Sequence, residues 1–362
     1  MTRYVVLILL ALVIAACGGP PAPTPDLVAT QVVVDEAAHA TIIAKAPTAT
    51  PKSTDTSTPA PTSTPAKTAT QSAIPTPSST PTPTPGLVWT DDQALATPTP
   101  RSTPTPKVAT RTRSQDAMIM VYVPAGDFTM GSPAGAWSDD EVPQHKVTMD
   151  GFWIDRTEVT NAQYRIFVGA TGHQTPTSCD WGDPTYGDVA KANHPVVCVS
   201  WDDAKRYCEW AGAQLPMEAE WEKAARGLDG RIYPWGNSFD GSRVNYCDTN
   251  CEFSQKDTGV DDGYARTAPV GSYPTGASPY GALDMAGNVW EWVSDWYDFG
   301  YYGSSPQRNP QGPDSGHDRV LRGGSWFGFS FNGRAAFRAW LAPDKRDVVI
   351  GFRCIVSDTS SP

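Results

Sequence analysis

Short apolar stretches in the second part of the chain predict a set of strands. Residues 118–124 (MIMVYVP) are apolar, rich in strand-forming residues and bounded by proline, which is typical of a buried strand. Residues 126–131 predict a second strand after a turn. Residues 145–150 and 151–155 predict a further pair of strands.

Three helices are indicated by the residues at their starts and ends. Thr160 with Gln163 three positions later forms a capping box, as does Ser200 with Asp203, whose helix is expected to end at Gly212. A third helix is expected to begin with Pro216 at its first position and to end at Gly227. Its first turn contains Glu218 and Glu220, and its inner face would carry Trp221, Ala224 and Ala225.

Beyond Gly227 the periodicity fades, and glycine, proline, asparagine, aspartate and aromatic residues alternate. The pattern therefore predicts an α+β domain with little regular secondary structure, which needs covalent or ionic cross-links. Six cysteines follow Cys17, and an even number in an exported domain favours disulfides, for which the sequence alone allows 15 pairings. A zinc cluster is the weaker alternative, because the one close pair has no matching second pair and no nearby histidine.

The first 17 residues are interpreted as a lipoprotein signal peptide. Arg3 supplies the positive charge, and an apolar run follows that is too short for an ordinary membrane span. The run ends in IAACG, which resembles a bacterial lipoprotein box with Cys17 as the lipidated residue. Lipidation would anchor the protein to the cell membrane and place its fold outside the cytoplasm. Ordinary signal cleavage is the alternative.

Residues 18–116 are dominated by proline, threonine, serine and alanine. Such a segment cannot bury enough apolar surface to offset its ordering entropy, so we expect a disordered linker with a semi-rigid, extended character. The folded domain is then expected to span residues 117–362. Residues 1–115 hold slightly more basic than acidic side chains although the whole chain carries a net charge of −11, so the domain is acidic. This charge argues against nucleic-acid binding and leaves the oligomeric state open.

The stretch Gly281–Trp296 (GALDMAGNVWEWVSDW) combines three tryptophans with carboxylate and amide side chains, including Asp284, Asn288 and Glu291. Large aromatic residues favour burial, and buried carboxylates need a partner. Two interpretations remain open on local sequence: the carboxylates cap helices or pair with arginines, or they bind a hard cation such as calcium, which takes oxygen ligands.

Together with motifs elsewhere in the chain, this stretch resembles the formylglycine-generating enzyme family, also called the sulfatase-modifying factor family. The resemblance covers about residues 117–356, and it implies the family's C-type-lectin-like α+β fold. The segments that carry it are Glu158–Tyr164, His194–Gly212, Leu215–Gly227, Tyr233–Asn237, Asp261–Pro274, Gly281–Trp296, Val320–Trp326 and Gly351–Cys354.

The resemblance also implies the cross-links. The family's pattern suggests a disulfide from Cys208 to Cys354, and the remaining cysteines would then pair as Cys247 with Cys251 and Cys179 with Cys198. Family members typically carry two structural calcium sites. One maps to Asn245, Asp262 and the carbonyls of Tyr246 and Tyr264, and the other maps to Asp284, Glu291 and the carbonyls of Gly287 and Val289.

Catalytic members carry two cysteines after the Gly-Gly-Ser motif, which bind copper and oxidise a substrate cysteine to formylglycine with O2. Here those positions fall near Gly328 and Gly333, and no cysteine occurs between Cys251 and Cys354. Copper(I) prefers sulfur ligands and glycine offers none, so the resemblance does not imply a copper site. The histidine run of the family's iron-dependent branches is missing too, and Ser325 is better interpreted as a turn residue than as a nucleophile.

These observations leave two main hypotheses. In the first, the domain is a pseudoenzyme that binds a peptide or glycan in an aromatic, arginine-bearing groove, whereas the competing interpretation of these residues is core packing and ion pairing, which we favour for Trp290. In the second, the chain is a formylglycine-generating oxidase with a rearranged site. A purely structural function of the domain is a third possibility. The candidate groove residues are Trp326, Phe327, Phe329, Phe331, Arg334 and Arg338.

Overall fold

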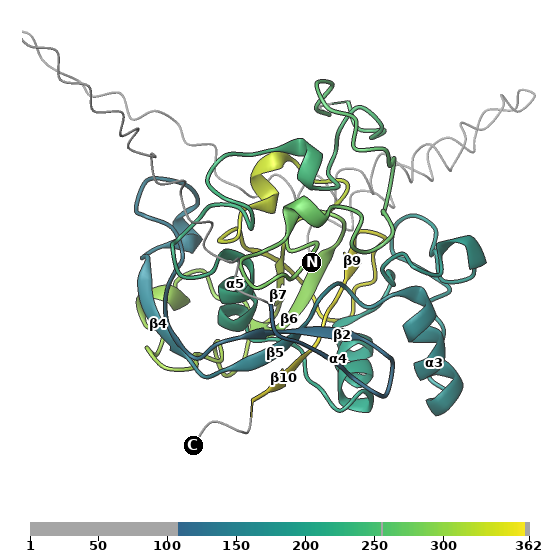
Figure 1. Ribbon diagram of the computed structural model, residues 1–362, viewed down its shortest axis with the longest axis horizontal. Coiled ribbons are helices and arrows are strands. Elements are labelled where there is room, and N and C mark those ends of the chain that lie inside the picture. The colour runs from purple at the N-terminus through teal and green to yellow at the C-terminus, as the bar shows by residue number, and fades with distance from the viewer. Residues whose placement is uncertain (1–107, 255, 359–362) are drawn as a thin grey trace, which may run out of the picture. The chain divides into compact units, whose positions relative to one another are not determined.

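The computed structural model describes residues 108–254 and 256–358. The predicted signal peptide with Cys17 and most of the predicted linker lie outside these residues. The fold is α+β with little regular structure, as predicted: short strands and three α-helices are joined by long irregular segments (Figure 1).

Two four-stranded sheets and a hairpin form the framework. The first sheet has the order β1-β2-β5-β10 and is antiparallel. The second has the order β8-β7-β6-β9, in which β6 and β9 run parallel, and β3 pairs with β4 alone. The strands are β1 (Thr110–Thr112), β2 (Ile119–Val123), β3 (Gly126–Met130), β4 (His145–Met149), β5 (Phe152–Asp155), β6 (Trp290–Trp296), β7 (Arg319–Arg322), β8 (Ala339–Leu341), β9 (Ile350–Gly351) and β10 (Ile355–Ser357).

The strands are where the sequence predicts them, but their pairing differs from the simplest expectation. The strands at 145–149 and 152–155 do not pair with each other, because β4 turns back onto β3 while β5 joins β2 and β10. The backbone at Asp150 and Gly151 therefore passes from the hairpin to the sheet.

The folded part also begins earlier than residue 117, the predicted boundary. Strand β1 pairs with β2 in the register Thr110 with Val121. Just after it, Arg113 is buried and binds both Asp116 and Asp155 through its guanidinium group. The last residues of the predicted linker are thus ordered, because a buried arginine between two carboxylates and a strand pairing hold them.

All three predicted helices are present. Helix α3 (Asn161–Thr171) and α4 (Trp201–Trp210) both begin with the predicted capping boxes at Thr160 and Ser200. Helix α5 (Glu218–Arg226) begins two residues later than expected, with Met217 rather than Pro216 next to its first turn, and it ends at Gly227, whose φ of 70° favours glycine.

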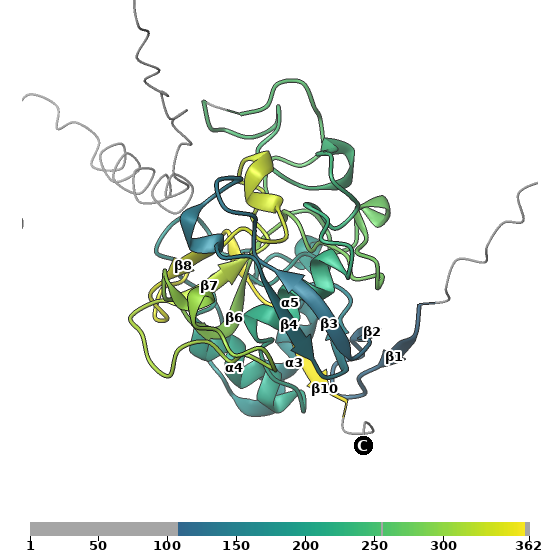
Figure 2. The ribbon, with the colours of Figure 1, turned by 90° about the vertical axis from the view of Figure 1, so that its left-hand side faces the viewer.

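Helix α5 packs between the two four-stranded sheets. One buried cluster joins Trp221 of α5 to Val121 of β2, Ile154 of β5, Val293 of β6 and Val320 of β7. Figure 2 shows α5 with β6 and β7 to one side and β2 to the other. Because the helix is enclosed, even its charged residues are buried, and their partners must come from the surrounding strands and loops.

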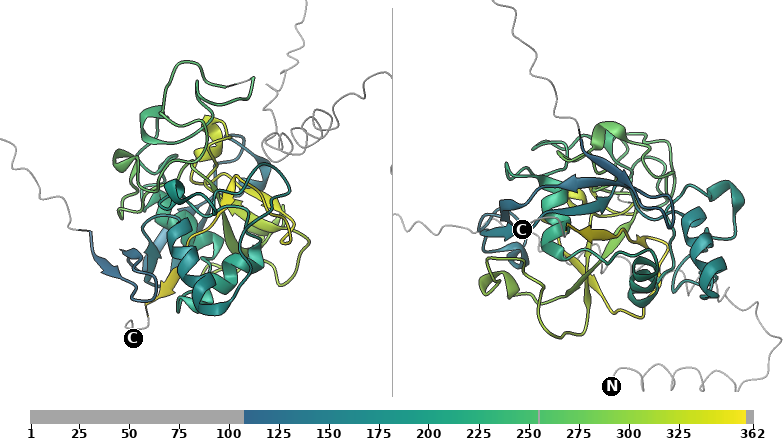
Figure 3. Two further views of the ribbon diagram at one scale, coloured as in Figure 1. Left: turned by 90° about the vertical axis from the view of Figure 1, so that its right-hand side faces the viewer. Right: turned by 60° about the horizontal axis from the view of Figure 1, so that its bottom comes forward.

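The irregular segment between α5 and β6 gathers at one end of the domain. The 3-10 helix Ser330–Gly333 lies beside it, as the left view of Figure 3 shows. Phe253 from this loop region contacts both Phe327 and Phe329, with ring centroids 5.4 and 5.8 Å apart. This end of the domain contains the positions that the family resemblance singles out.

Candidate functional site

Gly328 lies two residues before the 3-10 helix Ser330–Gly333, and Gly333 is its last residue. As glycines, neither has a side chain that could bind a metal. The carbonyl of Gly328 accepts a hydrogen bond from the Cys247 amide at 2.9 Å. A Cβ on Gly328 would lie 3.1 Å from the Ser325 carbonyl oxygen and 3.2 Å from Asn332 Oδ1. The polar groups around this position are therefore a backbone carbonyl and an amide, which are oxygen ligands rather than the sulfur that copper(I) prefers.

All six cysteines of the described residues form disulfides. The pairs are Cys179–Cys198, Cys208–Cys354 and Cys247–Cys251, which are the three pairs that were predicted. The second bridge joins α4 to the segment just before β10 across 146 residues. No cysteine of the domain is left as a free thiol.

The candidate groove residues do not line an exposed groove. Trp326 and Phe327 are each only 4% exposed and belong to the main hydrophobic core, as Trp290 does. Phe329 and Phe331 are half-buried and stack on each other with their ring centroids 5.5 Å apart. Glycines between aromatic residues suggest exposure, whereas in this segment they allow a tight turn that directs the rings inward.

The two groove arginines are buried in ion pairs. Arg334 binds Glu141 through two hydrogen bonds of 2.8 and 2.7 Å. Arg338 binds Glu218 in the same way at 2.7 and 3.0 Å. Both carboxylates are buried, so each pair neutralises charge inside the protein. The local sequence does not predict the partners, because Glu141 lies nearly two hundred residues from Arg334.

A cleft of about 430 Å³ does lie next to Arg334. Its guanidinium group sits 4.0 Å from the ring centroid of Trp137, a tryptophan that is 41% exposed. Amide side chains of Gln144 and Asn237 and the hydroxyl-bearing Ser132 also line the cleft. Trp137 was not among the predicted groove residues; the single sequence indication is a tryptophan in a loop of small and acidic residues.

The first predicted calcium site has features that fit a cation. Asn245 is fully buried, and its Oδ1 atom has no hydrogen-bond partner in the described residues. Its amide nitrogen is held by the Arg266 carbonyl and by Asn288 Oδ1, which fixes the direction of Oδ1. The carboxylate of Asp262 lies between the amides of Tyr246 and Tyr264, which donate to it at 3.0 and 2.9 Å. Burial raises the pKa of Asp262 to about 7.

The second predicted site does not fit calcium. Both carboxylate oxygens of Glu291 accept hydrogen bonds from Arg353 at 2.7 Å, and Trp221 Nε1 also donates at 2.7 Å. Arg353 is fully buried and thus supplies the positive charge that a metal would otherwise provide. The alternative interpretation, pairing with an arginine, applies to Glu291.

Beside this pair lies a buried carboxyl that the sequence reasoning did not single out. Glu158 is fully buried, and its Oε1 accepts a hydrogen bond from Asn288 while Oε2 has no partner in the described residues. Burial, and next the negative charge of Asp284, raise the pKa of Glu158 well above its usual value. Asp284 itself accepts a hydrogen bond from the Gly271 amide at 2.6 Å. Glu158 precedes α3 in the motif EVTNAQY, which gives no sign of its burial.

The fold and the site together define a disulfide-linked, loop-rich α+β domain. Its three disulfides indicate an extracytoplasmic location. Within the described ranges, no helix is long and apolar enough to cross a membrane. No cluster of three or more histidine, cysteine, aspartate or glutamate side chains suited to a metal occurs in this part of the chain either.

The chain belongs to the family of sulfatase-modifying factor enzyme 1-like domains, whose model matches residues 105–358. It is 39% identical over 291 residues to the formylglycine-generating enzyme of Streptomyces coelicolor, covering 68% of this chain and 91% of that protein. It is 37% identical over 279 residues to the mouse formylglycine-generating enzyme, covering 65% and 74%.

The chain is similar both to proteins named as enzymes and to a protein named as inactive. The mouse protein named inactive C-alpha-formylglycine-generating enzyme 2 is 34% identical over 281 residues, covering 66% of this chain and 85% of that protein. Among solved structures, PvdO from Pseudomonas aeruginosa superimposes with a TM-score of 0.58 and 28% identity, covering 70% of this chain and 99% of that one. Membership in the family therefore does not by itself decide whether the chain is an enzyme.

Proposed function

We propose that the protein is a membrane-anchored lipoprotein whose extracytoplasmic domain is non-catalytic and binds a peptide or glycan. The observation that carries the non-catalytic part is the state of the thiols. Every cysteine of the domain is paired in a disulfide, and glycine occupies positions 328 and 333. Copper-thiolate oxidation needs free thiolates, and the domain has none to offer.

The cleft beside Trp137 supports the binding part of the proposal. An exposed indole ring over a fixed guanidinium group offers a flat apolar face, and the amides of Gln144 and Asn237 offer both donors and acceptors. Such a combination suits the planar amides of a peptide or the hydroxyl groups of a glycan. Arg334 would position the ring of Trp137 rather than bind the ligand itself, because its charge is already paired with Glu141.

We also propose one structural calcium ion, at the first predicted site. The unpartnered Oδ1 of Asn245 and the nearby carboxylate of Asp262 supply oxygen ligands, which calcium prefers. The ion would tie the loop around residue 245 to the loop around residue 262, where regular secondary structure is missing. At the second site, Arg353 replaces the cation.

The test of catalysis is an oxidation assay on the full chain with its disulfides intact. A peptide with the family's Cys-x-Pro-x-Arg motif is incubated with the protein, copper and O2, and formylglycine is measured by mass spectrometry. The Streptomyces coelicolor enzyme is the positive control. We expect product from the control and none from this chain. Formylglycine formed by this chain would establish the alternative, an oxidase with a rearranged site.

The binding proposal is tested with peptide and glycan arrays probed with the full chain and with the Trp137→Ala variant. We expect ligands of one class to be retained by the native protein and lost from the variant. Phe299→Ala is the matched control, since Phe299 is 58% exposed and does not line the cleft. Ligands lost equally from both variants, or from neither, would rule out this cleft as the binding site.

The membrane anchor is tested at Cys17. We expect an alkyne-labelled fatty acid to be incorporated into the native protein and to be absent from the Cys17→Ser variant, which should leave the membrane fraction. Incorporation into the variant would refute lipidation at this residue.

A further inference from the structure

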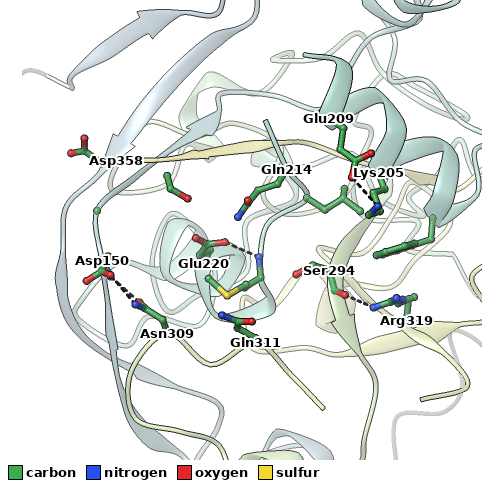
Figure 4. Close-up of a pocket in the computed structure, with 15 residues that line it drawn as sticks. Asp150, Lys205, Glu209, Gln214, Glu220, Ser294, Asn309, Gln311, Arg319 and Asp358 are labelled. Atoms are coloured by element: carbon green, nitrogen blue, oxygen red, sulfur yellow. Dashed lines mark hydrogen bonds and ion pairs between the residues drawn. The ribbon is translucent and has the colours of Figure 1, made fainter. Parts of the chain in front are cut away.

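A second cavity, of about 610 Å³, lies away from Gly328 and Gly333. It is lined by one side of α4, the start of α5, single residues of β6 and β7, and the end of β10 (Figure 4). None of its lining residues belongs to the segment 322–338, which contains the family's reaction positions. A ligand bound here would therefore not occupy those positions.

The most buried acidic residue of this cavity is Glu220, in the first turn of α5. Only 4% of its surface is exposed, yet it lines the cavity. Its Oε2 accepts a hydrogen bond from the Met217 amide at 2.7 Å, whereas its Oε1 has no hydrogen bond in the described residues. This oxygen is therefore available at the cavity to a ligand that donates a hydrogen bond.

Further acceptors occur in the rest of the lining. Figure 4 shows Gln214 and Gln311 next to Glu220, and their amide oxygens are further potential acceptors. Asp150 and Asp358 add carboxylates on one side, where Asp150 is paired with Arg308.

The two cations of the lining are already engaged. Lys205 binds Glu209 at 2.8 Å. The guanidinium group of Arg319 lies between the rings of Trp201 and Trp296, 3.7 and 3.5 Å from their centroids, and donates to the Ser294 carbonyl. These engagements disfavour an anionic ligand and favour one that donates hydrogen bonds and carries positive charge.

We infer that this cavity binds a primary ammonium group, such as a lysine side chain or the amino terminus of a peptide, with Glu220 as its counter-ion. An ammonium group donates three hydrogen bonds and accepts none, which matches the free Glu220 oxygen and the amide oxygens of Gln214 and Gln311. The inference is independent of the Trp137 cleft and of the loss of oxidase chemistry.

Binding of an ammonium group at Glu220 should release a proton. Burial, and next the negative charge of Asp295, raise the pKa of Glu220 to about 8, so the empty site holds a neutral carboxyl at neutral pH. The bound cation favours the carboxylate, so the affinity should rise about tenfold per pH unit up to about pH 8 and then level off. The charged groups that line the cavity or face Glu220 across it are Asp150, Lys205, Glu209, Asp295, Arg319 and Asp358.

The experiment is a calorimetric titration of the full chain with the peptide acetyl-Ala-Lys-Ala-amide at pH 6, 7 and 8. Its counterpart with an acetylated lysine carries no charge, and cellobiose serves as a neutral polyhydroxyl probe. We expect the charged peptide alone to bind, with proton uptake by the buffer. Equal binding of the acetylated peptide, binding of cellobiose alone, or no binding of the charged peptide would each overturn the inference.

Variants locate the site. Glu220→Gln keeps the acceptor for the Met217 amide but removes the charge, so we expect binding to weaken about thirtyfold at pH 8 and to lose its pH dependence. Glu209→Gln, on the solvent-exposed rim, is the matched control and should weaken binding by less than about threefold. Gln311→Ala, on a loop, gives a second readout that does not alter α5. Unchanged binding by both Glu220→Gln and Gln311→Ala would refute the assignment.

Discussion

The ion pair between Arg338 and Glu218 decides whether the arginines after the Gly-Gly-Ser motif hold the fold or hold a ligand. Arg338 is 3% exposed and Glu218 is 2% exposed. Two hydrogen bonds join them, and Arg338 also donates to the Asp140 carbonyl at 2.9 Å. Burial by itself lowers the pKa of Arg338, but the negative charge of Glu218 outweighs this effect and raises it overall, so the guanidinium group keeps its charge.

Replacing Arg338 with methionine should destabilise the domain strongly. The substitution leaves the Glu218 carboxylate buried, with the Tyr302 hydroxyl at 3.3 Å and Arg322 at 3.7 Å as its closest remaining partners. Leaving one member of a buried ion pair uncompensated costs about 3–5 kcal/mol. For a domain of this size, each kcal/mol lowers the melting temperature by about 2–4 °C, so we expect a decrease of about 6–20 °C.

The assay is urea denaturation and thermal unfolding of three variants. Arg338→Met is compared with Arg338→Met/Glu218→Gln, in which the orphaned charge is also removed, and the double variant should recover part of the lost stability. Arg308→Met is the matched control, because its pair with Asp150 is exposed and should contribute less than about 1 kcal/mol. A loss below about 1 kcal/mol for Arg338→Met, together with loss of ligand binding, would refute the structural interpretation and restore the groove.

Three further predictions concern the cross-links and the buried acids. Replacing both Cys208 and Cys354 with alanine opens a loop of 146 residues and should lower stability by about 5 kcal/mol in the chain-entropy model, measured by urea denaturation; a loss below about 1 kcal/mol would contradict the model. Glu220 has a raised pKa in the folded state, so its contribution to stability is present at pH 4 and is lost as the pH rises towards about 8. Glu220→Gln should therefore gain in melting temperature relative to the native protein between pH 5 and pH 8, and a constant difference would contradict the raised pKa. Calcium should raise the melting temperature of the native protein but not of Asn245→Ala/Asp262→Ala, and an equal rise in both would place calcium elsewhere.

The local elements of this fold could be predicted from the sequence because their determinants are local. The capping boxes at Thr160 and Ser200, and the stop at Gly227, fix the ends of helices within a few residues of the chain. The disulfide between Cys208 and Cys354 could be predicted only through the resemblance to a family, since the two residues are 146 positions apart.

The candidate site was harder to predict because its determinants are distant in the sequence. Whether Glu291 binds calcium or an arginine depends on Arg353, which is 62 residues away. Whether Arg334 faces a ligand or the core depends on Glu141, which is 193 residues away. A sequence pattern gives the charge of each residue but not its partner. Because α5 is buried between two sheets, the partner decides whether a charged side chain is neutralised inside the protein or is available to a ligand.

The structure also accounts for how the scaffold persists without the two thiols of the family's catalytic members. The turn at 325–333 is held by interactions that involve no side chain at positions 328 and 333: the Gly328 carbonyl accepts from the Cys247 amide, and Asn332 Oδ1 accepts from the Phe329 amide at 2.7 Å. Trp326 lies in the core from the same turn, and its amide donates to the Asn288 carbonyl. Since these contacts use the backbone at residue 328 and no side chain at either position, glycine at both positions is compatible with an intact turn.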